Sequence, residues 1–151
     1  MRVFRVARTE FCDVSGEGAK IYGGRWNLPG DAALYAGGSV AIALLERLTV
    51  DPELFTSGRD KLYSVMEFHL ADELIFSPKI SDLPKGWDAI PHLLVSQQWG
   101  SRLLRSGKVC FAVPSVIDPS SKNYVLNPKS SLFSKVRWQV YPLRIDPRLI
   151  R

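Results

Sequence analysis

Only two stretches of this 151-residue chain have the length and periodicity of helices, and every other apolar segment is short enough to be a strand. The first helix is expected to begin after Ser39, a good N-cap, and to end near Val50. The second is expected within residues 91–106, because Gly107 ends the apolar periodicity there. Five strands are expected, at residues 1–6, 33–36, 62–70, 109–113 and 136–145.

The strands cluster at both ends of the chain around the two helices, an order that favours an α+β domain over a regular βαβ fold. Residues 9–20 and 114–127 are expected to be loops, because they are rich in small, polar and turn-forming residues. No repeat or linker divides the chain, so residues 1–151 are expected to form a single compact domain. The Gly-x-Gly-x-x-Gly motif is absent, and a nucleotide would therefore need an arrangement other than a Rossmann site.

Composition excludes several classes of protein. No apolar run approaches the roughly 20 residues that a membrane helix needs, and the N-terminus lacks the apolar segment of a signal peptide, so we expect a cytoplasmic protein without membrane contact. Cys12 and Cys110 are too few for a disulfide framework and are expected to be structural. Together with His69 and His92 they lack the spacing of metal ligands, so neither a metal nor a prosthetic group is expected.

The net charge of +5 is unevenly distributed along the chain. Residues 1–75 hold 8 Lys and Arg against 11 Asp and Glu, a balance of −3, whereas residues 76–151 hold 12 against 4, a balance of +8. Such a basic half can attract nucleic acid, an acidic protein or a phosphate-bearing ligand. Charge alone does not choose among these partners.

The sequence Tyr-Gly-Gly-Arg-Trp-Asn at residues 22–27 indicates a binding site. Two adjacent glycines allow the backbone to approach a ligand closely, and Arg25 offers a planar fork of donors that suits a pyrophosphate. A planar, anionic molecule such as a nucleotide fits this set. Glu46 lies on an apolar flank of the first helix. Its carboxylate is either ion-paired with Arg47 or Arg25 for structural reasons, or partly desolvated because its charge is used.

The order and spacing of these residues resemble the RES-domain family of bacterial toxins, which is named after an Arg, a Glu and a Ser. The corresponding residues here are Arg25, Glu46 and Ser115. The likeness covers most of the chain and is carried by Phe4-Arg5 and by the segments YGGRWNLPG, LYAGGSVAIALLE, FAVPS and YVLNP. One departure follows Asn127-Pro128, where this chain has Lys129-Ser130 and the family commonly has a His.

The resemblance implies a fold similar to the ADP-ribosyltransferase toxins, in which a cleft between small mixed or antiparallel sheets holds NAD+ as the substrate. It implies cleavage of the nicotinamide–ribose bond, with Glu46 stabilising the positive charge that develops on the ribose. Arg25 would bind the pyrophosphate, and Tyr35 would stack on nicotinamide or bond the ribose. The further binding candidates are Arg5, Tyr22, Trp26, Asn27, Ser39 and Ser115. Water, phosphate and a protein side chain all stay open as acceptors of the ADP-ribose.

The resemblance also implies a partner, an antitoxin with an Xre-like helix-turn-helix domain that occludes the cleft in a hetero-oligomeric complex built on a dimer. Contact with DNA would then belong to the antitoxin. An alternative function is a basic nucleic-acid-binding module or RNA-directed toxin that stacks bases on Trp26, Tyr124 and Trp138. A further alternative is a catalytically inactive relative that keeps the fold only to bind its partner.

Overall fold

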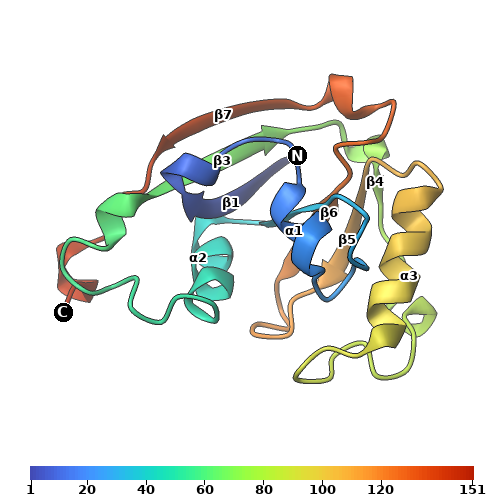
Figure 1. Ribbon diagram of the computed structural model, residues 1–151, viewed down its shortest axis with the longest axis horizontal. Helices are drawn as coiled ribbons and strands as arrows, with labels where there is room; N and C mark the ends of the chain where they lie inside the picture. Colours follow the sequence, from blue (N-terminus) through green and yellow to red (C-terminus); the bar gives the residue numbers. More distant parts are fainter.

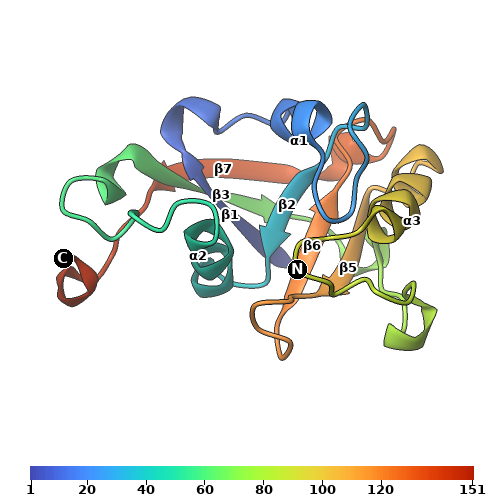
Figure 2. The same cartoon turned by 60° about the horizontal axis from the view of Figure 1, so that its bottom comes forward.

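The computed structural model describes residues 1–151, which form a seven-stranded sheet and three helices (Figures 1 and 2). The strands are β1 (Arg2–Arg8), β2 (Leu34–Gly37), β3 (Tyr63–His69), β4 (Ile75–Phe76), β5 (Cys110–Pro114), β6 (Lys122–Leu126) and β7 (Arg137–Pro142). The helices are α1 (Glu17–Tyr22), α2 (Val40–Leu48) and α3 (Leu94–Arg105). The order in the sheet is β4-β5-β6-β2-β1-β3-β7, and only β4 and β5 are parallel. The expected α+β class is confirmed.

The sheet consists of two halves with a weak join. A single register pair, Phe4 with Gly37, connects β1 to β2, whereas β1 and β3 pair along their whole length. In Figure 1 the strands of the half β1-β3-β7 run across those of β5 and β6. The two small sheets implied by the family resemblance are therefore two halves of one continuous sheet.

The inner face of the curled sheet packs against itself. Its core combines side chains from both halves of the sheet, namely Val3, Met66 and Phe68 from one half and Leu34, Ala112 and Leu126 from the other. All six are buried, and removal of this apolar surface from water provides the main driving force for the fold. Cys110 lies fully buried in the same core, where burial raises its pKa to about 12.

The helices α2 and α3 cover different halves of the outer face. Ala43 of α2 packs with Val6 and Val65, and Leu104 of α3 packs with Phe111 and Val125. The strand register places these partners on one side of the sheet. The helix α2 also packs on β2, and a Cβ atom at Gly37 would meet Ile42, so α2 lies over the join of the sheet.

Two expected loops contain regular structure. The strand β6 lies within the expected loop 114–127, and α1 begins within the expected loop 9–20 and ends at Tyr22. The strand was missed because its five residues begin with Lys and Asn and it is stabilised by pairing with β2 and β5 on both sides. The helix was missed because it has six residues, contains Gly18 and buries none of its side chains. None of the helices has the length and hydrophobicity needed to cross a membrane.

Candidate active site

The loop of residues 23–33, which joins α1 to β2 and is called the Arg25 loop below, is rigidly anchored. Backbone hydrogen bonds between Gly24 and Asn27 close a tight turn around Arg25 and Trp26. A Cβ atom at Gly24 would lie 2.7 Å from the hydroxyl oxygen of Tyr35, so this position requires glycine. The Trp26 ring is 2% exposed and packs between the rings of two other tryptophans, Trp87 and Trp99.

Tyr35 and Asn27 hold this turn through a closed set of hydrogen bonds. The Tyr35 hydroxyl donates to Asn27 Oδ1 (2.6 Å) and accepts from the Trp26 backbone N–H (3.0 Å). The Asn27 amide donates to the carbonyls of Ala19, Leu28 and Asp31. Burial raises the pKa of Tyr35 well above its usual range, which keeps the phenol neutral. We therefore correct two expected roles: Trp26 and Asn27 shape the turn, because the Trp26 ring is buried and the Asn27 amide is bonded within the loop. The Tyr35 hydroxyl is also engaged in the turn, and stacking on its half-buried ring stays a prediction.

Arg25 projects from this turn and is held from one side only. Its Nη1 donates to the backbone carbonyls of Trp87 (2.9 Å) and Ala89 (2.7 Å), and it forms no ion pair. Burial lowers the pKa of Arg25, while the charges of Glu46 and Asp88 raise it. The two carbonyls fix the guanidinium and leave its remaining N–H donors available to an anion.

Glu46 enters the same space from α2. It lies one helical turn after the buried Ile42, and its Oε1 accepts hydrogen bonds from Ser115 Oγ (2.7 Å) and Asn123 Nδ2 (2.7 Å). Neither Arg25 nor Arg47 forms an ion pair with it, so the structural explanation considered from sequence is wrong. The carboxylate is held through one oxygen, and Oε2 makes no hydrogen bond.

The two donors to Glu46 come from neighbouring strands. Ser115 follows β5, is fully buried, and its Oγ also accepts from the Asp118 backbone N–H (3.1 Å). Asn123 belongs to β6, and its Oδ1 is enclosed without a partner. Sequence reasoning missed Asn123 because it lies in an expected loop. The apolar residues 124–126 that follow it are the signal that could have placed it on a strand.

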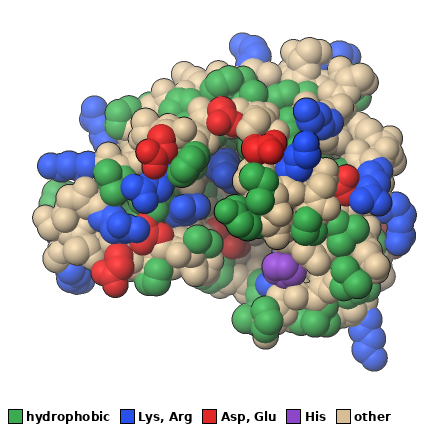
Figure 3. Space-filling view, in the orientation of Figure 1, with side chains coloured by type: hydrophobic (Ala, Val, Ile, Leu, Met, Phe, Trp, Pro, Cys, Tyr) green, Lys and Arg blue, Asp and Glu red, His purple; other side chains and the backbone are tan.

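Two further arginines, which have no ion-pair partner, lie near the join of the sheet. Arg5 of β1 donates from Nη1 to the Tyr35 backbone carbonyl (3.3 Å) across the join of the sheet. Burial and the nearby charge of Arg47 both lower the pKa of Arg5. The Nε atoms of both Arg5 and Arg47 are enclosed and unbonded. Figure 3 shows the surface hollowed near the middle of this face, next to α2, with Lys or Arg side chains inside the hollow.

The remaining sequence candidates lie apart from this cluster. Tyr22, at the end of α1, is 83% exposed, and its side chain makes no hydrogen bond with the residues of this cluster. Ser39 caps α2 as expected, accepting from the Ile42 N–H (3.2 Å), so its hydroxyl already has a structural role. Partial burial lowers the pKa of His92, which we did not expect at a site, and the nearby charge of Arg25 lowers it further.

The Asn127 segment, where the expected His is replaced, is structural in this chain. The buried Asn127 amide donates to the carbonyls of Leu104 (2.9 Å) and Lys108 (3.0 Å), and Ser130 Oγ donates to the Gly107 carbonyl (2.8 Å). These bonds fasten the end of β6 to the end of α3. They provide no group to the space around Glu46.

The aromatic residues invoked for nucleic-acid binding do not form one surface. Trp26 and Tyr124 are buried, at 2% and 7% exposure, and only Trp138 is exposed. Base stacking needs accessible aromatic faces. The structure thus removes the stacking platform on which that alternative depended.

Comparison with known proteins agrees with this arrangement. Residues 2–146 match the RES domain model. This chain belongs to the RES-domain family. The family resemblance noted in the sequence is therefore confirmed. Of the three residues matched to the family's name, Arg25 lies near enough to Glu46 to feel its charge, and the buried Ser115 donates to the Glu46 carboxylate.

Several relatives of this RES protein are named toxins. It is 39% identical to the "Prs ADP-ribosylating toxin" of Sphingobium sp. strain YBL2, over 99% of this chain and 95% of that protein. It is 33% identical to "Toxin Res" of Yersinia enterocolitica, over 89% of each chain. The crystal structure of the M. tuberculosis MbcT–MbcA toxin–antitoxin complex contains a chain with the same fold, with a TM-score of 0.74, 19% identity, and coverage of 98% of this chain and 85% of that one.

Proposed function

We propose that this RES protein is the toxin of a toxin–antitoxin pair and that it consumes NAD+ by breaking the nicotinamide–ribose bond. The observation that carries the proposal is a carboxylate held through one oxygen only, in the same space as arginines that have no ion-pair partner. A substrate with an anionic centre and a developing cation complements such a site. Family membership supports the same conclusion.

Cleavage of the nicotinamide–ribose bond requires few catalytic groups. The bond from ribose C1′ to the nicotinamide nitrogen breaks, and its electron pair leaves with nicotinamide, whose ring nitrogen was cationic and becomes neutral. Positive charge then develops at C1′, where the Glu46 carboxylate stabilises it. An acceptor oxygen forms the new bond to C1′ and releases its proton. No general acid is required for this leaving group, in agreement with a site that has a single carboxylate in its centre.

The arginines supply the binding energy. Arg25 and Arg5 are rigidly placed through backbone carbonyls and retain unpaired N–H donors, which suits them to the diphosphate of the dinucleotide. Their charges also favour an anion in a partly buried space, where electrostatic interactions are stronger than in water. Tyr35 contributes by positioning these arginines: its hydroxyl accepts from the Trp26 N–H next to Arg25, and its backbone carbonyl accepts from Arg5.

A second candidate function differs only in the acceptor. Transfer of ADP-ribose to a protein side chain shares the same first step, and the relative at 39% identity is named an ADP-ribosylating toxin. Hydrolysis would give free ADP-ribose, and phosphorolysis would give its 1-phosphate. We propose water or phosphate as the acceptor, and the products of the reaction distinguish them from a protein acceptor.

The test is brief induction of the protein in bacteria, with the cellular NAD+ pool and the products measured, beside the Glu46→Gln variant. Rapid loss of NAD+ that requires Glu46 supports the proposal, and free ADP-ribose or its phosphate identifies the acceptor. A stable pool with one ADP-ribosylated protein would favour the second candidate. A stable pool with no modified protein would contradict both.

We also propose an antitoxin partner that occludes the space around Glu46 in the cytoplasm, where NAD+ is available. The solved neighbour is a toxin–antitoxin complex, and the +8 balance of residues 76–151 favours docking of an acidic surface. Co-expression with the adjacent small reading frame should neutralise toxicity and copurify a complex. Neither effect would be seen if this partner is wrongly assigned.

A further inference from the structure

Arg47 is a charged residue in a row of α2 whose preceding member is buried, and no residue within α2 pairs with it. The buried residues of α2 are Ile42 and Ala43, and one helical turn later the same two rows are continued by Glu46 and Arg47. Both side chains are half-buried: Glu46 reaches Ser115 and Asn123 on the β5–β6 side of the join, and Arg47 reaches Tyr63 of β3 on the other side. One turn of α2 therefore places a carboxylate and a guanidinium on the two sides of the join.

The charge of Arg47 is not compensated by the protein. It makes no hydrogen bond and no ion pair, its Nε is enclosed, and its charge lies close enough to Arg5 to lower the pKa of that residue. Five other arginines, Arg2, Arg8, Arg59, Arg105 and Arg148, each pair with a carboxylate. Two adjacent, partly buried cations without an anion are unfavourable, and such arrangements concentrate at functional sites.

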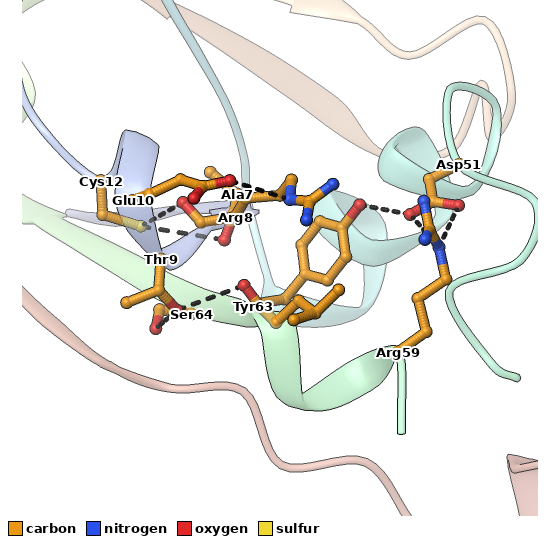
Figure 4. A network of polar contacts seen from close by, with 10 residues as sticks. Ala7, Arg8, Thr9, Glu10, Cys12, Asp51, Arg59, Tyr63 and Ser64 are labelled. Carbon is orange, nitrogen blue, oxygen red and sulfur yellow. Dashed lines mark hydrogen bonds and ion pairs between the residues drawn. The ribbon is translucent and has the colours of Figure 1, made fainter. Parts of the chain in front are cut away.

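Arg47 is nevertheless held in place. Its guanidinium lies over the ring of Tyr63, 5.3 Å from the centroid. The Tyr63 hydroxyl donates to the buried Asp51 carboxylate, whose two oxygens also accept from Arg59 Nε (both 2.9 Å), as Figure 4 shows. Stacking fixes the plane of a guanidinium without using its N–H groups. The network thus positions Arg47 and leaves its donors free.

We infer that Arg47, together with Arg5, binds a phosphate group of the substrate. The inference rests on the proposed function and names the part of the dinucleotide that these residues recognise, its diphosphate. That group has two negative charges, and Arg47 adds a further guanidinium to Arg25 and Arg5, which are proposed above to bind it. Tyr63 and Asp51 act as positioning residues that hold Arg47 from behind.

The experiment compares the wild-type protein with Arg47→Gln and with Arg144→Gln, which removes an exposed arginine that has no ion-pair partner and serves as the charge-matched control. Loss of a charge-assisted hydrogen bond should raise the KM for NAD+ by about 10- to 100-fold, with kcat changed by less than about threefold. The dissociation constant for ADP-ribose, measured by calorimetry, should rise by a similar factor. Arg47→Lys, which keeps the charge, should give intermediate values if Arg47→Gln does not fold.

The two readouts separate the failures of the two proposals. If the wild-type protein releases no nicotinamide but binds ADP-ribose in an Arg47-dependent manner, the proposed reaction is wrong and the phosphate site stands. If NAD+ is cleaved and the Arg47→Gln variant retains the wild-type KM and ADP-ribose affinity, the phosphate site is wrong. A fall in kcat with unchanged KM would also overturn it, since that result would mean that Arg47 acts only in the transition state and not in binding the substrate.

Discussion

At the scale of single residues, the central feature is the way in which one carboxylate is held. Glu46 Oε1 accepts from Ser115 and Asn123, two side chains supplied by the neighbouring strands β5 and β6. A fixed anion stabilises a developing cation better than a mobile one, because no reorganisation is needed during the reaction. Glu46 and Ser115 were predictable from sequence, whereas Asn123 depended on the strand that the polar composition of its region concealed.

Asn123→Ala should therefore reduce kcat/KM for NAD+ by about 10- to 100-fold, through loss of one hydrogen bond to a charged group. Ser115→Ala should have an effect of similar size, and the double variant should lose less than the product of the two, because both donors act on one oxygen. Rates of nicotinamide release with purified variants check this. Wild-type activity in Asn123→Ala would show that the amide does not orient the carboxylate.

Asp51 is a second carboxylate held by side-chain hydrogen bonds, and it contributes to the stability of the fold. Its hydrogen bonds from Arg59 and Tyr63 lower its pKa, so the folded state favours the ionised form. Asp51→Asn should destabilise the protein by about 2 kcal/mol, a fall in Tm of roughly 4–8 °C. Thermal melts at neutral pH measure this difference directly.

The lowered pKa of Asp51 also determines how the stability of the protein depends on pH. A depressed pKa gives stability that is fully present above the unfolded value of about 3.9 and is lost as the pH falls through the folded value. The Tm difference between wild type and Asp51→Asn should thus be constant above about pH 5 and shrink below pH 4. A difference that instead grew toward low pH would contradict the assignment of these hydrogen bonds.

At the scale of elements, α3 supports the Arg25 loop through one point of very close contact. A Cβ atom at Gly100 would overlap the backbone carbonyl of Trp26, and the neighbouring Ser101 Oγ accepts from the Leu28 N–H (2.7 Å). The helix was predictable from its apolar periodicity. Its contact with a loop some 70 residues earlier was not, because nothing local in the sequence specifies which surface an amphipathic helix covers.

Gly100→Ala should accordingly destabilise the protein by roughly 3 kcal/mol or displace the Arg25 loop, with a large loss of activity in either case. Gly18→Ala is the matched control, because a Cβ atom there would meet nothing within 4 Å and alanine favours the helix α1. Thermal melts and activity measurements on both variants are the test. Normal behaviour of Gly100→Ala would mean that α3 and the loop are not in contact as described.

At the scale of the whole molecule, the sheet is divided where the site lies. The order of strands and helices in the sequence indicated the α+β class, and short-range patterns located five of the seven strands. The curl of the sheet and the single register pair between β1 and β2 arise from long-range pairing, which no local pattern contains. That pairing brings Arg5, Arg25 and Glu46, far apart in the chain, around one space.

The most direct test of this account is the release of nicotinamide from NAD+ by the purified protein, compared with Glu46→Gln, which keeps the shape of the side chain and removes its charge. The account predicts release by the wild-type protein and a rate lower by at least about 100-fold in the variant. Release at the same rate in both proteins, or none in a folded wild-type protein freed of its antitoxin, would contradict it.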